Sequence, residues 1–192
     1  MRETKASFLK LQKKYIAFIK KNETTFNPFY DSNAQLKKFY LPLCQEIFKT
    51  YKLKKKTIIV GIAGAQGTGK TTVSKILNII LEEKYKLQTI NISIDDFYKT
   101  FKERTQMSKT KHHLFQTRGV PGTHDLQLLR YALIKLKGKK FKSIFLPRFD
   151  KSIDDRLKKN KWKKITKKPK IIIFEGWCVA AQHQNKKRLI MP

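Results

Sequence analysis

The chain has 192 residues and a mass of 22.6 kDa, enough for one domain with a helical extension but not for two full domains. Hydrophobic residues make up 40% and aromatic residues 11%, so the chain can build a core, which excludes wholesale disorder. The 44 Lys and Arg residues exceed the 14 Asp and Glu residues and give a net charge of +30. Because the excess is nearly all lysine scattered along the chain, it favours a solvated surface over a nucleic-acid-binding face.

Cysteine usage and hydropathy favour a cytoplasmic protein. Cys44 and Cys178 are too few and too isolated for a disulfide framework, and no spacing of zinc ligands accompanies them. Lysines interrupt the N-terminal segment every few positions, so it lacks the apolar core of a signal peptide. No run approaches the roughly 20 apolar residues that span a bilayer, so we expect no membrane segment.

Two helices are predicted in the N-terminal part of the chain. Residues 6–20 place apolar side chains at helical spacing, namely Phe8, Leu11, Tyr15, Phe18 and Ile19. A second helix is predicted over residues 31–51, with a kink or break at Pro42 and an apolar face formed by Leu36, Phe39, Tyr40, Ile47 and Phe48. We expect residues 1–55 to be a helical extension that packs against the main domain.

Residues 56–192 alternate between predicted strands and helices, which is typical of a parallel α/β sheet. Strands are predicted at residues 57–63, 88–94 and 171–174. A helix follows the first strand, with an apolar stripe at Val73, Ile76, Leu77, Ile80 and Leu81. Another is predicted at residues 124–137, with Thr123 as N-cap, Gly138 as stop, and Leu126, Leu129, Ala132, Leu133 and Leu136 facing inward. The lysine-rich residues 157–170 are predicted to be a solvated surface stretch.

A phosphate-binding loop is indicated between the first strand and its helix. Gly64, Gly69, Lys70 and Thr71 match G-x-x-x-x-G-K-[ST], and the strand before and the helix after supply the required context. Backbone amides would surround the phosphates, the lysine would contact the β and γ phosphates, and the threonine would bind Mg²⁺. The predicted nucleotide-binding residues are Gly64, Ala65, Gln66, Gly67, Thr68, Gly69, Lys70, Thr71 and Thr72.

A GTPase is disfavoured, and the remaining acids point to transfer chemistry. A GTPase should carry Asn-Lys-x-Asp, but the nearest match, residues 185–188, has Arg where the acid is needed. Asp95, Asp96 and Glu175 follow predicted parallel strands at the sheet edge where such folds bind ligands. A carboxylate there can deprotonate an acceptor hydroxyl, although Asp95 can also be read as a helix N-cap.

Five segments together resemble the D-glycerate 3-kinase family, within the P-loop kinases that include phosphoribulokinase, uridine kinase and pantothenate kinase. They are GIAGAQGTGKTTVSK, SIDDFYK, RGVPGTHD, LPRFDKSIDDR and FEGWCVA. The resemblance covers about residues 40–180. It implies a P-loop NTPase-type three-layer fold and ATP-dependent phosphoryl transfer to a small hydroxy acid, with ATP and Mg²⁺ as cofactors.

The resemblance also implies roles for individual residues. Lys70 and Asp95 are expected to be catalytic, with Asp96 as the alternate acid, while Thr71 and Glu175 are expected to hold Mg²⁺. The acceptor-side residues are Asp96, Arg118, Asp125, Arg148, Asp150 and Lys151. Arg118 or Arg148 would bind the acceptor's carboxylate, and surface salt bridges with Asp154 or Asp155 are the alternative.

The chain differs from the family's pattern at its C-terminus. The family's usual strand order, 2-3-1-4-5, would leave residues 57–63 at a sheet edge if the chain stops about sixteen residues after Gly176. Three explanations stay open: a truncated product, a shortened relative whose N-terminal helices cover that edge, or an ATP-binding protein without transfer activity. Electrostatic nucleic-acid binding, suggested by the charge alone, is the least favoured hypothesis.

Overall fold

The computed structural model describes residues 5–23 and 30–182. Its helices, in chain order, are α1 (Lys5–Asn22), α2 (Ser32–Gln35), the π turn η1 (Leu36–Tyr40), α3 (Leu41–Lys54), α4 (Lys70–Glu83), the 3₁₀ turn η2 (Ile94–Phe97), α5 (Phe101–Thr110), η3 (His113–Gln116), α6 (Leu126–Lys137) and η4 (Lys159–Lys161). The strands are β1 (Ile58–Ala63), β2 (Thr89–Ser93), β3 (Ile144–Leu146), β4 (Phe149–Asp150), β5 (Asp155–Arg156), β6 (Lys163–Ile165) and β7 (Ile171–Gly176). None of the helices in these two ranges is long and apolar enough for a membrane crossing.

The central sheet has three parallel strands in the order β1-β7-β2. β7 lies in the middle, with Ile171 level with Ile58 of β1 and with Thr89 of β2. Ile171, Ile172 and Ile173 have no exposed surface, as expected for a parallel strand covered on both faces. The predicted order is confirmed, and β1 lies at an edge of the described sheet.

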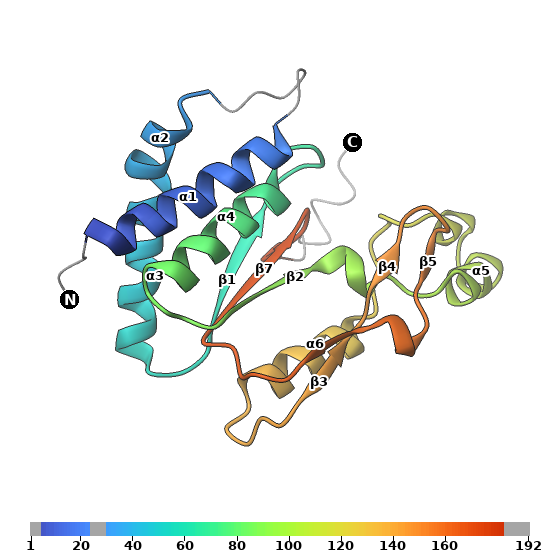
Figure 1. The fold of residues 1–192 in the computed structure, drawn as a ribbon. Coiled ribbons are helices and arrows are strands. Elements are labelled where there is room, and N and C mark those ends of the chain that lie inside the picture. The colour runs from blue at the N-terminus through green and yellow to red at the C-terminus, as the bar shows by residue number, and fades with distance from the viewer. Residues whose placement is uncertain (1–4, 24–29, 183–192) are drawn as a thin grey trace.

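Helices cover both faces of this sheet, which gives the predicted three-layer α/β fold (Figure 1). On one face α1, α3 and α4 share a core with alternate residues of β7, namely Ile171 and Ile173. On the other face α6 and the β3–β6 ribbon pack against Ile172 and the β2 residues Ile90 and Ile92. The extension predicted for residues 1–55 therefore shares a core with the sheet, while the domain boundary itself stays a prediction.

The break predicted at Pro42 occurs as the π turn η1 directly before α3. Proline has no amide hydrogen, so the regular bond to the preceding turn is lost at this position. The wider turn also changes the angular spacing of the side chains within it, Leu36–Tyr40, around the helix axis. As a result Phe39, predicted to face the core, is 59% exposed, whereas Leu36 is buried.

The prediction for the helix at residues 124–137 was wrong at its N-terminal end. Asp125, not Thr123, is the N-cap, because its carboxylate accepts a hydrogen bond from the Leu128 amide at 3.0 Å. The helix therefore begins at Leu126, whose side chain is 61% exposed rather than inward. Gly138 ends the helix as predicted.

The lysine-rich stretch at residues 157–170 is only partly a surface loop. It contains β6, which pairs antiparallel with β3 and buries Ile165 against Ile144. β4 and β5 form a second short antiparallel pair beyond the sheet, next to α5 (Figure 1). Residues 185–188, which were compared with the guanine signature, lie outside the described residues.

Candidate active site

The phosphate-binding loop joins β1 to α4 through two glycines in the left-handed region. Gly67 has φ 79° and Gly69 has φ 78°, a conformation that side chains other than glycine adopt only at a cost. Gly69 directly precedes the first residue of α4. The turn therefore presents the helix N-terminus, with its free amides and partial positive charge, to the space above the sheet.

The loop closes on itself through hydrogen bonds to one carbonyl group. The Lys70 ammonium donates to the Ala65 oxygen at 2.6 Å, and the Thr68 hydroxyl donates to the same oxygen at 2.8 Å. Gly64 has little room, because a Cβ there would lie 2.9 Å from the Thr68 hydroxyl oxygen. The lysine is thus held across the loop that the sequence predicts to bind phosphates.

Thr71 and Glu175, the two residues predicted to hold a metal, lie side by side. The Thr71 hydroxyl donates to Oε1 of Glu175 at 3.2 Å. Glu175 is buried at the carboxyl end of the central strand β7, level with Ile62 of β1 and Ser93 of β2. Parallel pairing in this register brings the three strand ends together beside the loop.

Asp95 and Asp96 follow β2 in the turn η2 and have different surroundings. The Asp95 side chain is 30% exposed and accepts a bond from the Lys151 ammonium at 2.8 Å. Asp96 accepts a bond from the Phe149 amide at 3.2 Å. Burial raises the pKa of Asp96, although the Phe149 bond and the charge of Arg148 act in the opposite direction. Asp95 is therefore the more open of the two carboxylates.

A cavity of about 1030 Å³ joins the loop to these acids. From the predicted sets, its lining includes Gln66, Gly67, Gly69, Lys70, Thr71, Asp95, Asp96, Arg118, Lys151 and Glu175. The other predicted loop residues, Gly64, Ala65, Thr68 and Thr72, lie outside the lining. The cavity lining therefore includes both the phosphate loop and three residues of the β4–β5 hairpin, Phe149, Lys151 and Asp154.

Three predicted acceptor-side residues lie outside the cavity lining. Asp125 caps α6 and accepts a bond from Arg156 at 3.0 Å. Asp150 accepts bonds from the hydroxyl and the amide of Ser152, which lower its pKa and shape the hairpin turn. Arg148 makes no contact with the cavity, so Arg118 is the predicted arginine that the structure brings to it.

The cavity also contains aromatic side chains that were not predicted as site residues. Tyr98 stacks on His124 with ring centroids 4.1 Å apart and meets the edge of Phe149 at 5.3 Å. Nε2 of His124 is buried without a hydrogen-bond partner, and burial lowers the pKa of this imidazole. Tyr98 and Phe149 lie within the SIDDFYK and LPRFDKSIDDR segments, so these two motifs were the sequence signal that could have identified them as site residues.

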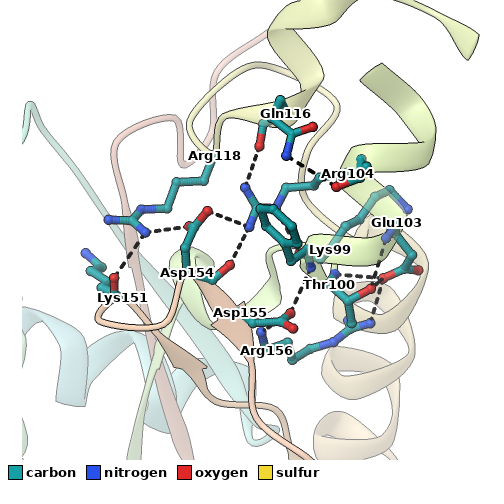
Figure 2. Close-up of polar contacts among 12 residues, drawn as sticks. Lys99, Thr100, Glu103, Arg104, Gln116, Arg118, Lys151, Asp154, Asp155 and Arg156 are labelled. Atoms are coloured by element: carbon teal, nitrogen blue, oxygen red, sulfur yellow. Dashed lines mark hydrogen bonds and ion pairs between the residues drawn. The ribbon is translucent and has the colours of Figure 1, made fainter. Parts of the chain in front are cut away.

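Arg104 was missed, and together with Asp154 it connects the hairpin to the rest of the site (Figure 2). The salt bridge between Arg118 and Asp154, predicted as the alternative to acceptor binding, is present in the structure. The Asp154 carboxylate lies between two guanidinium groups, those of Arg104 and Arg118. Beside this group, Arg156 contacts the carboxylates of Asp125 and Glu103. Three of the seven arginines in the chain meet here, but nothing near Arg104 in the sequence identifies it as a site residue.

The fold and this cavity define a nucleotide-binding α/β protein of the P-loop type. The chain matches the Phosphoribulokinase / Uridine kinase family over residues 59–187 and belongs to that family. The P-loop kinase resemblance is therefore confirmed.

Individual relatives agree with this assignment. The chain is 35% identical over 138 residues to "Uncharacterized kinase mug58" of Schizosaccharomyces pombe. The aligned region covers 68% of this chain and 50% of that protein. It is 33% identical over 132 residues to "Probable ATP-dependent kinase TDA10" of Saccharomyces cerevisiae, covering 62% of this chain and 45% of that protein. The chain thus spans about half the length of these curated relatives.

Solved structures include one with a named acceptor. The D-glycerate 3-kinase of Cryptococcus neoformans var. grubii aligns with a TM-score of 0.64 at 26% identity, over 77% of this chain and 56% of that one.

Proposed function

We propose that this chain binds Mg-ATP at the loop of residues 64–71 and transfers the γ-phosphoryl group to a hydroxyl of a small hydroxy acid of the glycerate type. The observation that carries the proposal is the convergence on one cavity of the loop lysine Lys70, the open carboxylate Asp95 and the cations Arg118 and Lys151. Likeness to a D-glycerate 3-kinase supports the choice of acceptor.

The nucleotide end of the cavity suits a polyphosphate. Amides at the start of α4 would donate to phosphate oxygens. The Lys70 ammonium, which contacts the Ala65 carbonyl in this structure, would turn to the β and γ phosphates and neutralise charge there. Only one hydrogen bond to a loop carbonyl would be exchanged for this stronger, charge-assisted contact.

Thr71 and Glu175 fit the requirements of Mg²⁺. This ion prefers oxygen ligands and is usually held by one or two protein oxygens together with phosphates and water. A hydroxyl and a carboxylate 3.2 Å apart supply such oxygens. No cluster of three or more acidic, His or Cys side chains suited to a metal occurs in the described part of the chain. When bound, the ion would neutralise charge that develops on the transferred group.

The acceptor end provides a base and a site for an anion. The Asp95 carboxylate would accept the proton of the acceptor hydroxyl as that oxygen bonds to the γ-phosphorus and the bond to ADP breaks. Arg118 would donate to the acceptor's carboxylate, and Lys151 would contribute a second positive charge. Products would be ADP, the phosphorylated acid and the released proton.

Turnover with Mg-ATP and D-glycerate tests the proposal, with ADP and phosphoglycerate measured separately. We expect Lys70→Ala and Asp95→Asn to lower kcat by about 10²- to 10⁴-fold. Lys75→Ala, an exposed lysine on the same helix, is the matched control and should retain activity. Wild-type turnover no higher than that of the two site variants would overturn the proposal.

A nucleotide-binding protein without transfer activity is the second candidate. The Lys151 ammonium contacts Asp95 at 2.8 Å and so covers part of the carboxylate that the transfer reaction needs. Tight Mg-ATP binding without acceptor-dependent ADP formation, over a panel of hydroxy acids and nucleosides, would favour this candidate.

A further inference from the structure

Arg104 is a charged side chain with no exposed surface, on the inner side of α5. Its guanidinium donates to the carbonyls of Lys99 (3.3 Å) and Gln116 (2.8 Å) and to both the carbonyl and the carboxylate of Asp154 (2.9 Å to Oδ2). A buried guanidinium is costly unless its donors are satisfied, and here they join three separate segments. Figure 2 shows this side chain between the three segments.

Asp154 is held by Arg104 in an uncommon backbone conformation. It lies in the turn between β4 and β5 with φ 51°, in the left-handed region that few residues other than glycine adopt. Because Arg104 binds both its carbonyl and its Oδ2 atom, the turn and the side chain are fixed together. The other carboxylate oxygen, Oδ1, is therefore directed to a defined position.

That position is occupied by Arg118 at the cavity. Nη1 of Arg118 donates to Oδ1 of Asp154 and, at 3.4 Å, to the Lys151 carbonyl, and its guanidinium carbon lies 5.9 Å from the centre of the Phe149 ring. The Arg118 side chain is 34% exposed, and its Nη2 and Nε make no hydrogen bond to other described residues. Two nitrogens thus remain available to a ligand, while the third is fixed.

We propose that Arg104 is a positioning residue of this site, which acts through Asp154 to hold the Arg118 guanidinium where it binds the anionic group of the acceptor. The identity of that acceptor rests on the proposed function, but the chain of contacts does not. A role in folding alone would require only that the donors of the buried guanidinium be satisfied, which backbone carbonyls such as that of Gln116 can do. The bond to the Asp154 carboxylate is what connects Arg104 to Arg118.

Arg156 provides a matched control on the same hairpin. It is 12% exposed and pairs with Asp125 at 3.0 Å and Glu103 at 3.2 Å, so its burial and ion pairing are similar to those of Arg104. It makes no contact with Arg118, and neither of its two acidic partners lines the cavity. Arg156→Lys should therefore disturb stability without moving Arg118.

The kinetic test compares Arg104→Lys with Arg156→Lys. We expect Arg104→Lys to raise the KM for glycerate by about 10-fold or more, with kcat and Mg-ATP affinity changed by less than about 3-fold. Arg156→Lys should leave the glycerate KM within about 2-fold of the wild type. In an Arg118→Ala background, Arg104→Lys should add no further increase, because both changes remove the same interaction. Equal effects of the two lysine variants, or independent effects of Arg104 and Arg118, would overturn the proposal.

A second readout does not depend on activity. With seven arginines in the chain, the Nε–H signals of the side chains can be resolved by NMR, and Arg118→Ala identifies the Arg118 signal. We expect restricted ps–ns motion of this group in the wild type and in Arg156→Lys, and free motion in Arg104→Lys. Unchanged motion in Arg104→Lys would refute the positioning role. Absence of glycerate-dependent turnover in the wild type would defeat only the proposed function.

Discussion

The two ends of the cavity are built differently. The loop of residues 64–71 makes its side-chain hydrogen bonds mainly within itself, to the Ala65 carbonyl, and depends on glycine for its shape. The hairpin end is joined to α5 and to Arg118 by ion pairs in which one or both side chains are partly exposed. A polyphosphate can supply the partners that the loop lacks, whereas a small acceptor has few groups with which to order its own site. We infer that preorganisation is concentrated where the ligand contributes least.

The largest expected effect on stability comes from Arg104→Ala. Removal of this fully buried guanidinium leaves the carbonyls of Lys99, Gln116 and Asp154 without their donor and should lower the free energy of unfolding by about 3 kcal/mol. Lys70→Ala should change it by less than about 0.5 kcal/mol, since it removes only a contact within the loop. Urea unfolding at pH 7 measures both, with the exposed Arg130→Ala as control. Similar losses for Arg104→Ala and Lys70→Ala would contradict the comparison.

Gly69→Ala tests the loop itself, with an intermediate expected effect. No atom lies within 4 Å of the added Cβ, so the cost comes from the left-handed backbone alone, about 1–2 kcal/mol. The affinity for Mg-ATP should fall as well as the stability, because the strained position directly precedes the amides that would bind phosphate. Isothermal titration with Mg-ATP and urea unfolding measure the two quantities. A stable variant with unchanged affinity would show that the loop shape is not required.

Glu103→Gln should have the smallest effect, because its ion pair with Arg156 lies at the outer rim of the hairpin end and the Glu103 side chain is 45% exposed. Although partial burial acts to raise the pKa of Glu103, hydrogen bonds from Thr100 and the charge of Arg156 lower it overall. The stabilisation is therefore present above the unfolded-state pKa of about 4.3 and is lost as pH falls through the lower folded-state value. We expect a loss of at most about 1 kcal/mol at pH 7 that shrinks progressively as the pH falls below the unfolded-state pKa. A difference between variant and wild type that does not change as the pH is lowered would exclude an electrostatic origin.

The parts of the site that the sequence predicted are those with local signals. The phosphate loop combines a motif with a strand before it and a helix after it, and Asp95, Asp96 and Glu175 follow apolar strands. Parallel strands end at the same edge of the sheet, so their acids converge without any knowledge of distant contacts. The order of β1, β7 and β2 followed from the family resemblance rather than from the residues.

The missed parts depend on contacts between distant segments. Arg104 lies on a short polar helix, and nothing nearby in the sequence distinguishes it from an exposed arginine. Its partner Asp154 is fifty residues away, so the contact cannot be read from a local pattern. β6 consists of two exposed lysines and Ile165, and its pairing with β3 is what makes it a strand. At α6 the sequence analysis placed the cap at Thr123, two residues too early, because only the hydrogen bond from the Leu128 amide identifies Asp125 as the cap.

The outer side of β1 affects how the molecule behaves among copies of itself. No described strand pairs with that side, and Ile59 there is 38% exposed. Exposed lysines adjoin it at positions 54, 55, 56 and 137. Like charges of this kind keep neighbouring molecules from adding strand to strand, but dissolved ions shorten the range of the repulsion to about 10 Å at 0.1 M and about 3 Å at 1 M. We therefore expect self-association through this strand to increase with ionic strength.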